Sequence, residues 1–266
     1  MIKWIIVFVA LSIIAAACTV RYKDFNFIKN QYIKSYHHSK QGILPYQIIG
    51  GNKKMKQYPL IIFMHGAGER GADNEKQLVH GKNWMQENLN KFGGIAVFPQ
   101  CPTNDFWSSV DIETTSTGSR IFQFNNKEAT PAMNMVLSLI DSLYKLPYID
   151  QDRIYVMGLS MGGMASFELM WRRQGMFAAG APICGGMTLS KAKEVAATPG
   201  IWIFHGSADE VVKPEFSREA TKALLNFNKN VKYTEYDGVG HNSWDNVFKE
   251  KDFFKWLYSH SLKNKK

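Results

Sequence analysis

The chain has 266 residues, of which 45% are hydrophobic and 21% charged, so its composition is that of a globular protein. This composition excludes a wholly disordered chain, a collagen-like fibre and a polytopic membrane protein. A chain of this length buries enough surface to fold without a metal ion, and three cysteines are too few for a disulfide scaffold. The net charge of +9 would suit an anionic partner, but a solvated surface rich in lysine is the interpretation that we favour.

The first eighteen residues have the pattern of a secretory signal. Lys3 supplies the positive charge, residues 4–17 are apolar apart from one serine, and small residues precede Cys18. The apolar run is short for a membrane span, which needs about 20 residues. A cysteine at this place resembles the lipobox of bacterial lipoproteins, which implies removal of residues 1–17 and a lipid anchor on Cys18. Ordinary cleavage near Ala17 and an uncleaved anchor are the alternatives. Each predicts an exported protein, periplasmic or at the cell surface.

The chain after the signal is predicted to have two parts. Residues 18–40 show no clear hydrophobic period and are interpreted as a tether and entry segment. Residues 41–266 contain no internal repeat and no linker, which predicts one folded domain. Cys101 and Cys184 lie in this domain, where they could form a disulfide or remain buried thiols; we favour the thiols.

From residue 41 onward, apolar runs of strand length alternate with amphipathic stretches of helix length. The predicted strands are Leu44–Ile49, Pro59–His65, Ile95–Pro99, Arg153–Gly158, Phe177–Ile183, Ile201–His205 and Lys232–Tyr236. The predicted helices are Asn74–Asn90, Lys127–Leu146, Met161–Arg173, Pro214–Asn228 and Trp244–His260. This alternation predicts an α/β fold with a mostly parallel, doubly wound sheet covered by helices on both faces.

One long polar segment, Thr103–Asn126, interrupts the alternation. A loop of this length in a compact domain is usually functional or disordered, and this one follows a strand at the carboxyl edge, where such sheets bind ligands. Its aromatic residues Trp107 and Phe122 could stack on a sugar or a phenolic ring. Packing in the core is the alternative for both.

A nucleophile is predicted at Ser160, in the centre of the G-x-S-x-G motif at residues 158–162. The motif lies between a predicted strand and a predicted helix. In that context the glycines permit a sharp turn that exposes the serine hydroxyl above the sheet.

A serine nucleophile needs a base and an acid that orients the base, in the order Ser, Asp, His in this fold class. Asp209 and His241 each follow a predicted strand at the same sheet edge as Ser160. Asp237 and Asp245 are competing acids, interpreted instead as a turn residue and a helix cap. The remaining histidines are interpreted as surface residues (His37, His38, His80 and His260) or as braces of loops (His65 and His205).

Acyl transfer also needs N–H donors for the oxyanion. Met161, directly after the nucleophile, is predicted to supply one, and the glycine-rich segment 65–71 the other. Within that segment we assign the Ala67 N–H, with Gly66 as the neighbouring possibility. The glycines do not fit a phosphate cradle, because no Gly-Lys-Ser/Thr follows them.

Five motifs together resemble secreted bacterial α/β-hydrolases of the predicted peptidase or esterase type. These are close to the feruloyl and acetyl-xylan esterases and to polyhydroxybutyrate-depolymerase-like proteins. The motifs are residues 65–71 (HGAGERG), 99–102 (PQCP), 158–163 (GLSMGG), 205–209 (HGSAD) and 240–244 (GHNSW). The resemblance covers about residues 41–260 and implies the α/β-hydrolase fold, with a triad of Ser160, His241 and Asp209. It also implies that Met161 and Ala67 are the oxyanion donors.

The sequence therefore predicts a serine hydrolase of carboxylic esters, with acetyl or feruloyl esters on plant polysaccharide as the expected substrates. The reaction needs no metal ion or cofactor, and no nucleic-acid motif is present. Glu69, Trp107 and Trp244 are candidate substrate contacts. For Trp244 the alternative is packing under His241. Glu69 could instead close the oxyanion loop by hydrogen bonds, which is the role that we favour for Arg70. A serine peptidase with the same triad and a non-catalytic carbohydrate-binding lipoprotein are the alternative functions.

Overall fold

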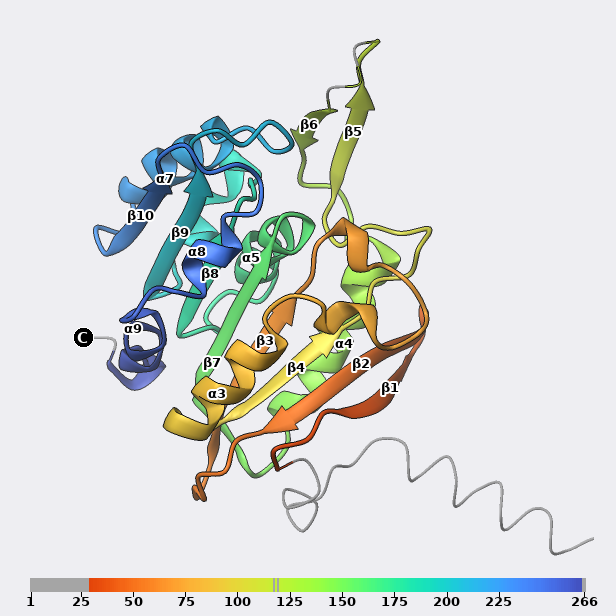
Figure 1. Cartoon of the computed structure of the whole chain (residues 1–266), viewed down its shortest axis with the longest axis vertical. Helices are drawn as coiled ribbons and strands as arrows, with labels where there is room; N and C mark the ends of the chain where they lie inside the picture. The colour runs from red at the N-terminus through yellow and green to blue at the C-terminus, as the bar shows by residue number, and fades with distance from the viewer. Residues whose placement is uncertain (1–28, 117, 119, 265–266) are drawn as a thin grey trace, which may run out of the picture.

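The computed structural model describes residues 29–264 apart from 117 and 119 (Figure 1). The predicted signal, Cys18 and residues 19–28 of the predicted tether lie outside this range. Among the helices within it, none has the length and apolar character that crossing a membrane requires.

The main sheet of the described chain has eight strands in the order β1-β2-β4-β3-β7-β8-β9-β10 (Figure 1). They are β1 (Ile33–Ser39), β2 (Gly42–Gly50), β3 (Tyr58–Met64), β4 (Ile95–Pro99), β7 (Ile149–Leu159), β8 (Ala179–Ile183), β9 (Gly200–Gly206) and β10 (Val231–Tyr236). β2 pairs antiparallel with β1 and with β4, and the other pairs are parallel. All seven predicted strands are present, and the mostly parallel sheet is confirmed.

Helices cover both faces of this sheet. One face packs against α4 (Pro131–Tyr144), α5 (Met161–Arg172), α6 (Ala192–Val195) and α7 (Glu215–Leu225). The other packs against α3 (Lys82–Phe92), α8 (Trp244–Val247) and α9 (Phe253–Ser259). The short 3-10 helices are η2 (Ala67–Glu69), η3 (Lys76–Leu78), η4 (Leu189–Lys191) and η5 (Leu262–Asn264). Successive side chains of a strand point to opposite faces of the sheet, so the sheet has one hydrophobic core on each face. In β3, Ile62 packs in the core on the α4–α7 face and Phe63 in the core on the α3, α8 and α9 face.

Four segments differ from the sequence prediction. β1 lies inside the predicted tether, so the folded chain begins before residue 41; as an edge strand it is largely exposed and carries no strong apolar pattern. The long polar segment holds a hairpin of β5 (Val110–Thr114) and β6 (Arg120–Phe124), which projects beyond the carboxyl ends of the parallel strands (Figure 1). The helix expected from Asn74 begins only at Lys82, after a glycine with φ of 79°. The last predicted helix is divided into α8 and α9.

Helix α5 lies directly against the sheet because its first turn has no side chains there. A Cβ added to Gly162 would lie 2.0 Å from the Met64 carbonyl oxygen, and one added to Gly163 would lie 2.3 Å from that of Ile183. Only glycine permits this approach. The contact fixes the start of α5 over the carboxyl ends of β3 and β8.

Candidate active site

Ser160 occupies the turn between β7 and α5, as predicted. Its backbone has φ of 55° and ψ of −118°, a conformation that is uncommon outside glycine. The Ser160 N–H donates to the Ile183 carbonyl at 2.9 Å, which ties the turn to β8. Such strain persists only where the surroundings impose it, and it is concentrated at active sites. The turn places the hydroxyl at the N-terminus of α5.

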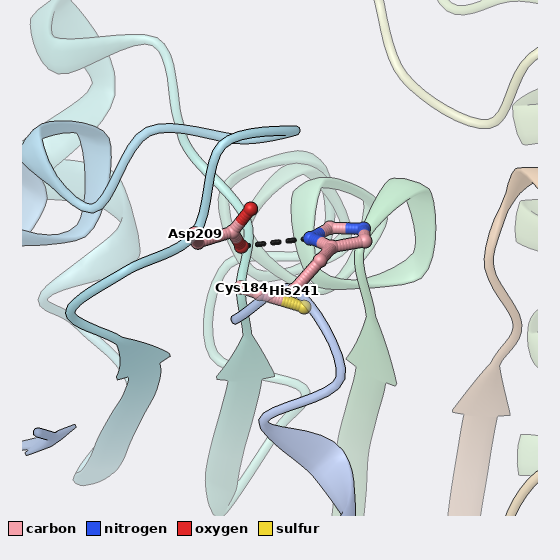
Figure 2. A group of neighbouring side chains, drawn as sticks. All are labelled: Cys184, Asp209 and His241. Carbon is pink, nitrogen blue, oxygen red and sulfur yellow. Dashed lines mark hydrogen bonds and ion pairs between the residues drawn. The ribbon is translucent and has the colours of Figure 1, made fainter. Parts of the chain in front are cut away.

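Asp209 follows β9 and is buried, with 2% of its surface exposed. Its Oδ1 accepts hydrogen bonds from the Val211 and Val212 N–H groups at 2.9 and 3.0 Å. Its Oδ2 accepts one from His241 Nδ1 at 2.7 Å (Figure 2). Burial alone would raise the pKa of Asp209, but the hydrogen bonds from His205 and His241 outweigh it and hold the pKa well below its usual range. The side chain is therefore a carboxylate at neutral pH.

His241 connects the acid to the nucleophile. Its Nδ1 donates to Asp209, and its Nε2 lies 2.9 Å from Ser160 Oγ, within hydrogen-bond distance. Because Nδ1 carries the proton in this pairing, Nε2 is free to accept the serine proton. The structure thus brings together the three side chains predicted from the sequence.

The competing acids are elsewhere. Asp237 accepts a hydrogen bond from Ser207, and Asp245 accepts one from Asn242, so both are the turn and helix-end residues that the sequence indicated.

His205 makes a second contact to the acid, which sequence reasoning did not foresee. Its Nε2 donates to the Val212 carbonyl at 2.8 Å and also lies 3.2 Å from Asp209 Oδ2. Its Nδ1 lies 2.7 Å from Ser217 Oγ in α7. The available signal was the spacing of four residues between His205 and Asp209 within one motif. His205 thus braces the loop that carries Asp209, as the sequence indicated, and it also contacts the carboxylate itself.

Two substitutions of His205 should separate an orienting role from simple packing. Glutamine places an amide N–H near the position of Nε2, facing Asp209, whereas asparagine places it near Nδ1, facing Ser217. We expect His205→Asn to lower kcat by about a hundredfold with little change in KM, because the carboxylate loses a fixed partner. His205→Gln should recover most of that loss. Steady-state kinetics on p-nitrophenyl acetate is the measurement, and equal losses in both variants would indicate packing alone.

Cys184 lies beneath the same group of side chains (Figure 2). Ligand-type atoms of Cys184, Asp209 and His241 lie within 4.8 Å of one another, a grouping that could suggest a metal site. However, both ring nitrogens of His241 are already engaged, one by Asp209 and one by Ser160. Burial raises the pKa of the Cys184 thiol, so it is not a ready anionic ligand. Within the described chain Cys101 and Cys184 are buried free thiols, as we favoured.

The predicted oxyanion donors both start helices beside Ser160. Ala67 begins η2 and Met161 begins α5, and the first N–H groups of a helix have no partner within it. Arg70 secures the η2 turn by donating to the carbonyls of Ala67 and Asp105, both at 3.0 Å, which confirms its structural role.

His65 braces the same turn from below. Its Nδ1 donates to the Gly66 carbonyl at 2.6 Å, and its Nε2 accepts from the Cys101 N–H at 2.9 Å. Burial lowers the pKa of His65 to about 4, so it is neutral at neutral pH and can accept that bond.

The candidate substrate contacts differ in whether the structure leaves them available to a substrate. The prediction for Trp107 is wrong, because its side chain is fully buried and its Nε1 donates to the His65 carbonyl at 3.2 Å. Phe122 is also buried, in a small cluster with Met164. Trp244 packs against His241 with ring centroids 5.5 Å apart, and Glu69 lies at the end of η2. These two remain candidates.

Comparison with known proteins identifies the family of the chain. Residues 47–258 match the family described as Phospholipase/Carboxylesterase. The chain is 26% identical over 154 residues to the bifunctional acetylxylan esterase/xylanase XynS20E of Neocallimastix patriciarum, covering 58% of this chain and 20% of that protein. It is 24% identical over 205 residues to a probable carboxylesterase, Os04g0669600, of Oryza sativa subsp. japonica, covering 71% of this chain and 83% of that one.

The fold is shared with solved esterases. A thermostable esterase is 31% identical, with a TM-score of 0.75 over 88% of this chain and 64% of that one. A ferulic acid esterase at 14% identity has a TM-score of 0.63 over 85% of this chain and 98% of that one, a likeness of fold. The chain thus spans about a fifth of the first relative and less than two thirds of the thermostable esterase. The chain belongs to the phospholipase/carboxylesterase family and has the α/β-hydrolase fold.

Proposed function

We propose that Ser160, His241 and Asp209 hydrolyse a carboxylic ester through an acyl-enzyme. The observation that carries the proposal is the continuous contact from Asp209 Oδ2 through both nitrogens of His241 to Ser160 Oγ, with distances of 2.7 and 2.9 Å. This is the arrangement that lets a base remove the serine proton while a carboxylate stabilises the imidazolium that forms.

In the first half-reaction, Ser160 Oγ attacks the ester carbonyl carbon as His241 Nε2 takes the hydroxyl proton. The negative charge that develops on the carbonyl oxygen is stabilised by the N–H groups of Ala67 and Met161. Collapse of the tetrahedral intermediate breaks the bond to the alcohol, and His241 returns the proton to the leaving oxygen. In the second half, His241 deprotonates a water that attacks the acyl carbon, and the acid leaves with Ser160 restored.

The proposed substrates are acetyl or feruloyl esters on plant polysaccharide. The similarity to a protein named as an acetylxylan esterase supports the first, and the resemblance of the motifs to those of feruloyl esterases supports the second. An exported protein held by a lipid on Cys18, as the sequence predicts, would meet such polymers outside the cytoplasm.

The test is a substrate panel: p-nitrophenyl acetate, acetylated xylan, methyl ferulate, tributyrin and a set of small peptides. We expect rapid turnover of the first and of acetylated xylan or methyl ferulate, with peptides cleaved far more slowly. Faster hydrolysis of peptides than of every ester would contradict the proposal and favour the peptidase. Preference for tributyrin over both plant esters would overturn the substrate class while leaving ester hydrolysis intact.

A further inference from the structure

Exposed lysines gather at the edge of the sheet where the parallel strands begin. Hydrogen bonds join the segments that carry them into one surface. In the loop between β2 and β3, the Asn52 N–H donates to Asn90 Oδ1 at 3.1 Å, near the end of α3. Gln57 Nε2 of the same loop donates to the Pro147 carbonyl at 3.4 Å, in the turn between α4 and β7. We call this surface the basic edge; its exposed lysines are Lys29, Lys53, Lys54, Lys56, Lys91 and Lys145.

The acidic residues around the basic edge do not neutralise it. Asp150 pairs with Arg153 at 2.7 Å, and Asp152 pairs with Lys263 at 2.8 Å, so both are engaged by other cations. Glu87, an exposed residue of α3, is the acid that remains. Among the residues that the structure describes, no lysine of the basic edge forms an ion pair, whereas several lysines elsewhere do: Lys34, Lys76, Lys127, Lys191 and Lys263. Part of the net charge of +9 is therefore concentrated here, where it would attract an anionic surface within about 10 Å.

The described chain begins at this same edge. Lys29 forms a β-bridge with Gly50, and the Asn30 N–H donates to the Gly50 carbonyl at 2.8 Å. The lipid that the sequence predicts on Cys18 precedes Lys29 by 11 residues. A stretch of that length reaches at most about 40 Å when fully extended. A membrane that holds Cys18 therefore keeps the basic edge within reach of its headgroups.

The candidate active site lies at the other end of the strands. The β2–β3 loop and the α4–β7 turn lead into the amino ends of β3 and β7, whereas Ser160 follows the carboxyl end of β7. Figure 1 shows the β2–β3 loop and the β5–β6 hairpin at opposite ends of the molecule. The seven residues of β3 alone span about 23 Å. A surface that binds the basic edge therefore leaves the edge with Ser160 open to solvent.

We propose that the basic edge binds the anionic headgroups of the membrane that holds the N-terminal segment, and so turns the active-site edge away from the lipid. Lysine side chains near an anionic lipid surface need no defined pocket, and each contributes about fivefold to binding. The predicted anchor favours a lipid surface over a soluble polyanion, because it brings this edge to the headgroups. The inference is independent of the proposed ester hydrolysis and adds an orientation of the domain on the membrane.

The first experiment measures the orientation of the full-length protein in vesicles. A fluorophore is attached to Gln57→Cys on the basic edge or to Glu113→Cys on the β5–β6 hairpin, and a nitroxide on the lipid headgroups quenches it. Cys101 and Cys184 are buried and do not react, and the labelled unsubstituted chain corrects for Cys18. We expect quenching at residue 57 to be at least about threefold stronger with phosphatidylglycerol than with phosphatidylcholine alone, and to be lost in high salt. Quenching at residue 113 should stay weak.

The second experiment removes three charges from the β2–β3 loop in one variant: Lys53→Gln, Lys54→Gln and Lys56→Gln. We expect the ratio of its partition coefficients on vesicles with and without phosphatidylglycerol to fall by about a hundredfold. The matched control removes the same charge around the start of α9: Lys249→Gln, Lys251→Gln and Lys255→Gln. It should leave the ratio nearly unchanged. Both variants should keep the melting temperature of the wild type, because all six side chains are exposed.

Several results would overturn the proposal. One is equal quenching at residues 57 and 113, or none at residue 57 in any vesicle. Another is a loss of binding in the control variant as large as in the loop variant, which would indicate net charge and not this edge. Retention on heparin that needs the loop lysines, without any response to phosphatidylglycerol, would assign the edge to a soluble polyanion. A wild type that hydrolyses no ester but is oriented as expected would refute the proposed function and leave this inference intact.

Discussion

Replacing Ser160 with alanine should abolish ester hydrolysis, with kcat falling by about a millionfold, because no other group on the turn can form the acyl-enzyme. The assay is p-nitrophenyl acetate hydrolysis together with labelling by a fluorophosphonate, which reacts with activated serines. Wild type should be labelled and the variant should not. Ser166→Ala is the matched control, since Ser166 lies on the same helix and only donates to the Gly162 carbonyl at 2.8 Å. It should remain active.

Two results would contradict this prediction in different ways. Activity or labelling that survives in Ser160→Ala would place the nucleophile elsewhere. A wild type as inert as the variant toward esters and the probe would favour a binding protein that keeps the fold. Comparing the thermal unfolding of both proteins excludes loss of structure as the cause.

Replacing Asp209 with asparagine is expected to lower kcat by about four orders of magnitude. The hydrogen bonds around Asp209 explain this expected loss. The N–H groups of Val211 and Val212 need an acceptor, so the asparagine oxygen must face them and its NH2 group must face His241. An NH2 group there favours the tautomer with the proton on Nε2, which cannot accept a proton from Ser160. The variant should fold, because its shape is unchanged.

The pH profile of kcat/KM provides the measurement. The pKa of Asp209 is held well below its usual range, so in the wild type the fall in rate toward acid pH should not come from protonation of this carboxylate. Asp237→Asn serves as the control, because Asp237 contacts Ser207 outside the triad. Loss of activity in Asp237→Asn but not in Asp209→Asn would show that the acid had been misassigned.

The triad could be predicted from the sequence because each member lies in a short motif at the end of a buried strand. The carboxyl ends of parallel strands meet at one edge, so the order along the chain was sufficient to bring Ser160, Asp209 and His241 together. The burial of Trp107 could not be predicted from the sequence, because only the tertiary structure shows that its ring is covered and that its Nε1 donates to the His65 carbonyl, just before the turn that carries Ala67. β1 was missed because an edge strand is partly exposed on both faces.

The contact roles of His80 and His205 depend on neighbours distant in the sequence. The His80 ring contacts that of Trp244, which lies more than 160 residues further along the chain, so this contact exists only in the folded protein. His205 contacts a helix as well as its own loop, and its motif alone suggests only a brace.

The close approach of Gly162 to the Met64 carbonyl has a consequence for how the enzyme would lose activity. Met64 leads directly into the turn that carries Ala67, and Gly162 follows directly after the serine and its neighbouring donor. One backbone contact thus supports both the proposed nucleophile, Ser160, and the proposed oxyanion donors, Ala67 and Met161. Heat or denaturant that separates α5 from β3 would remove both together, so inactivation should be all-or-none, with no intermediate form in which only one half of the machinery survives.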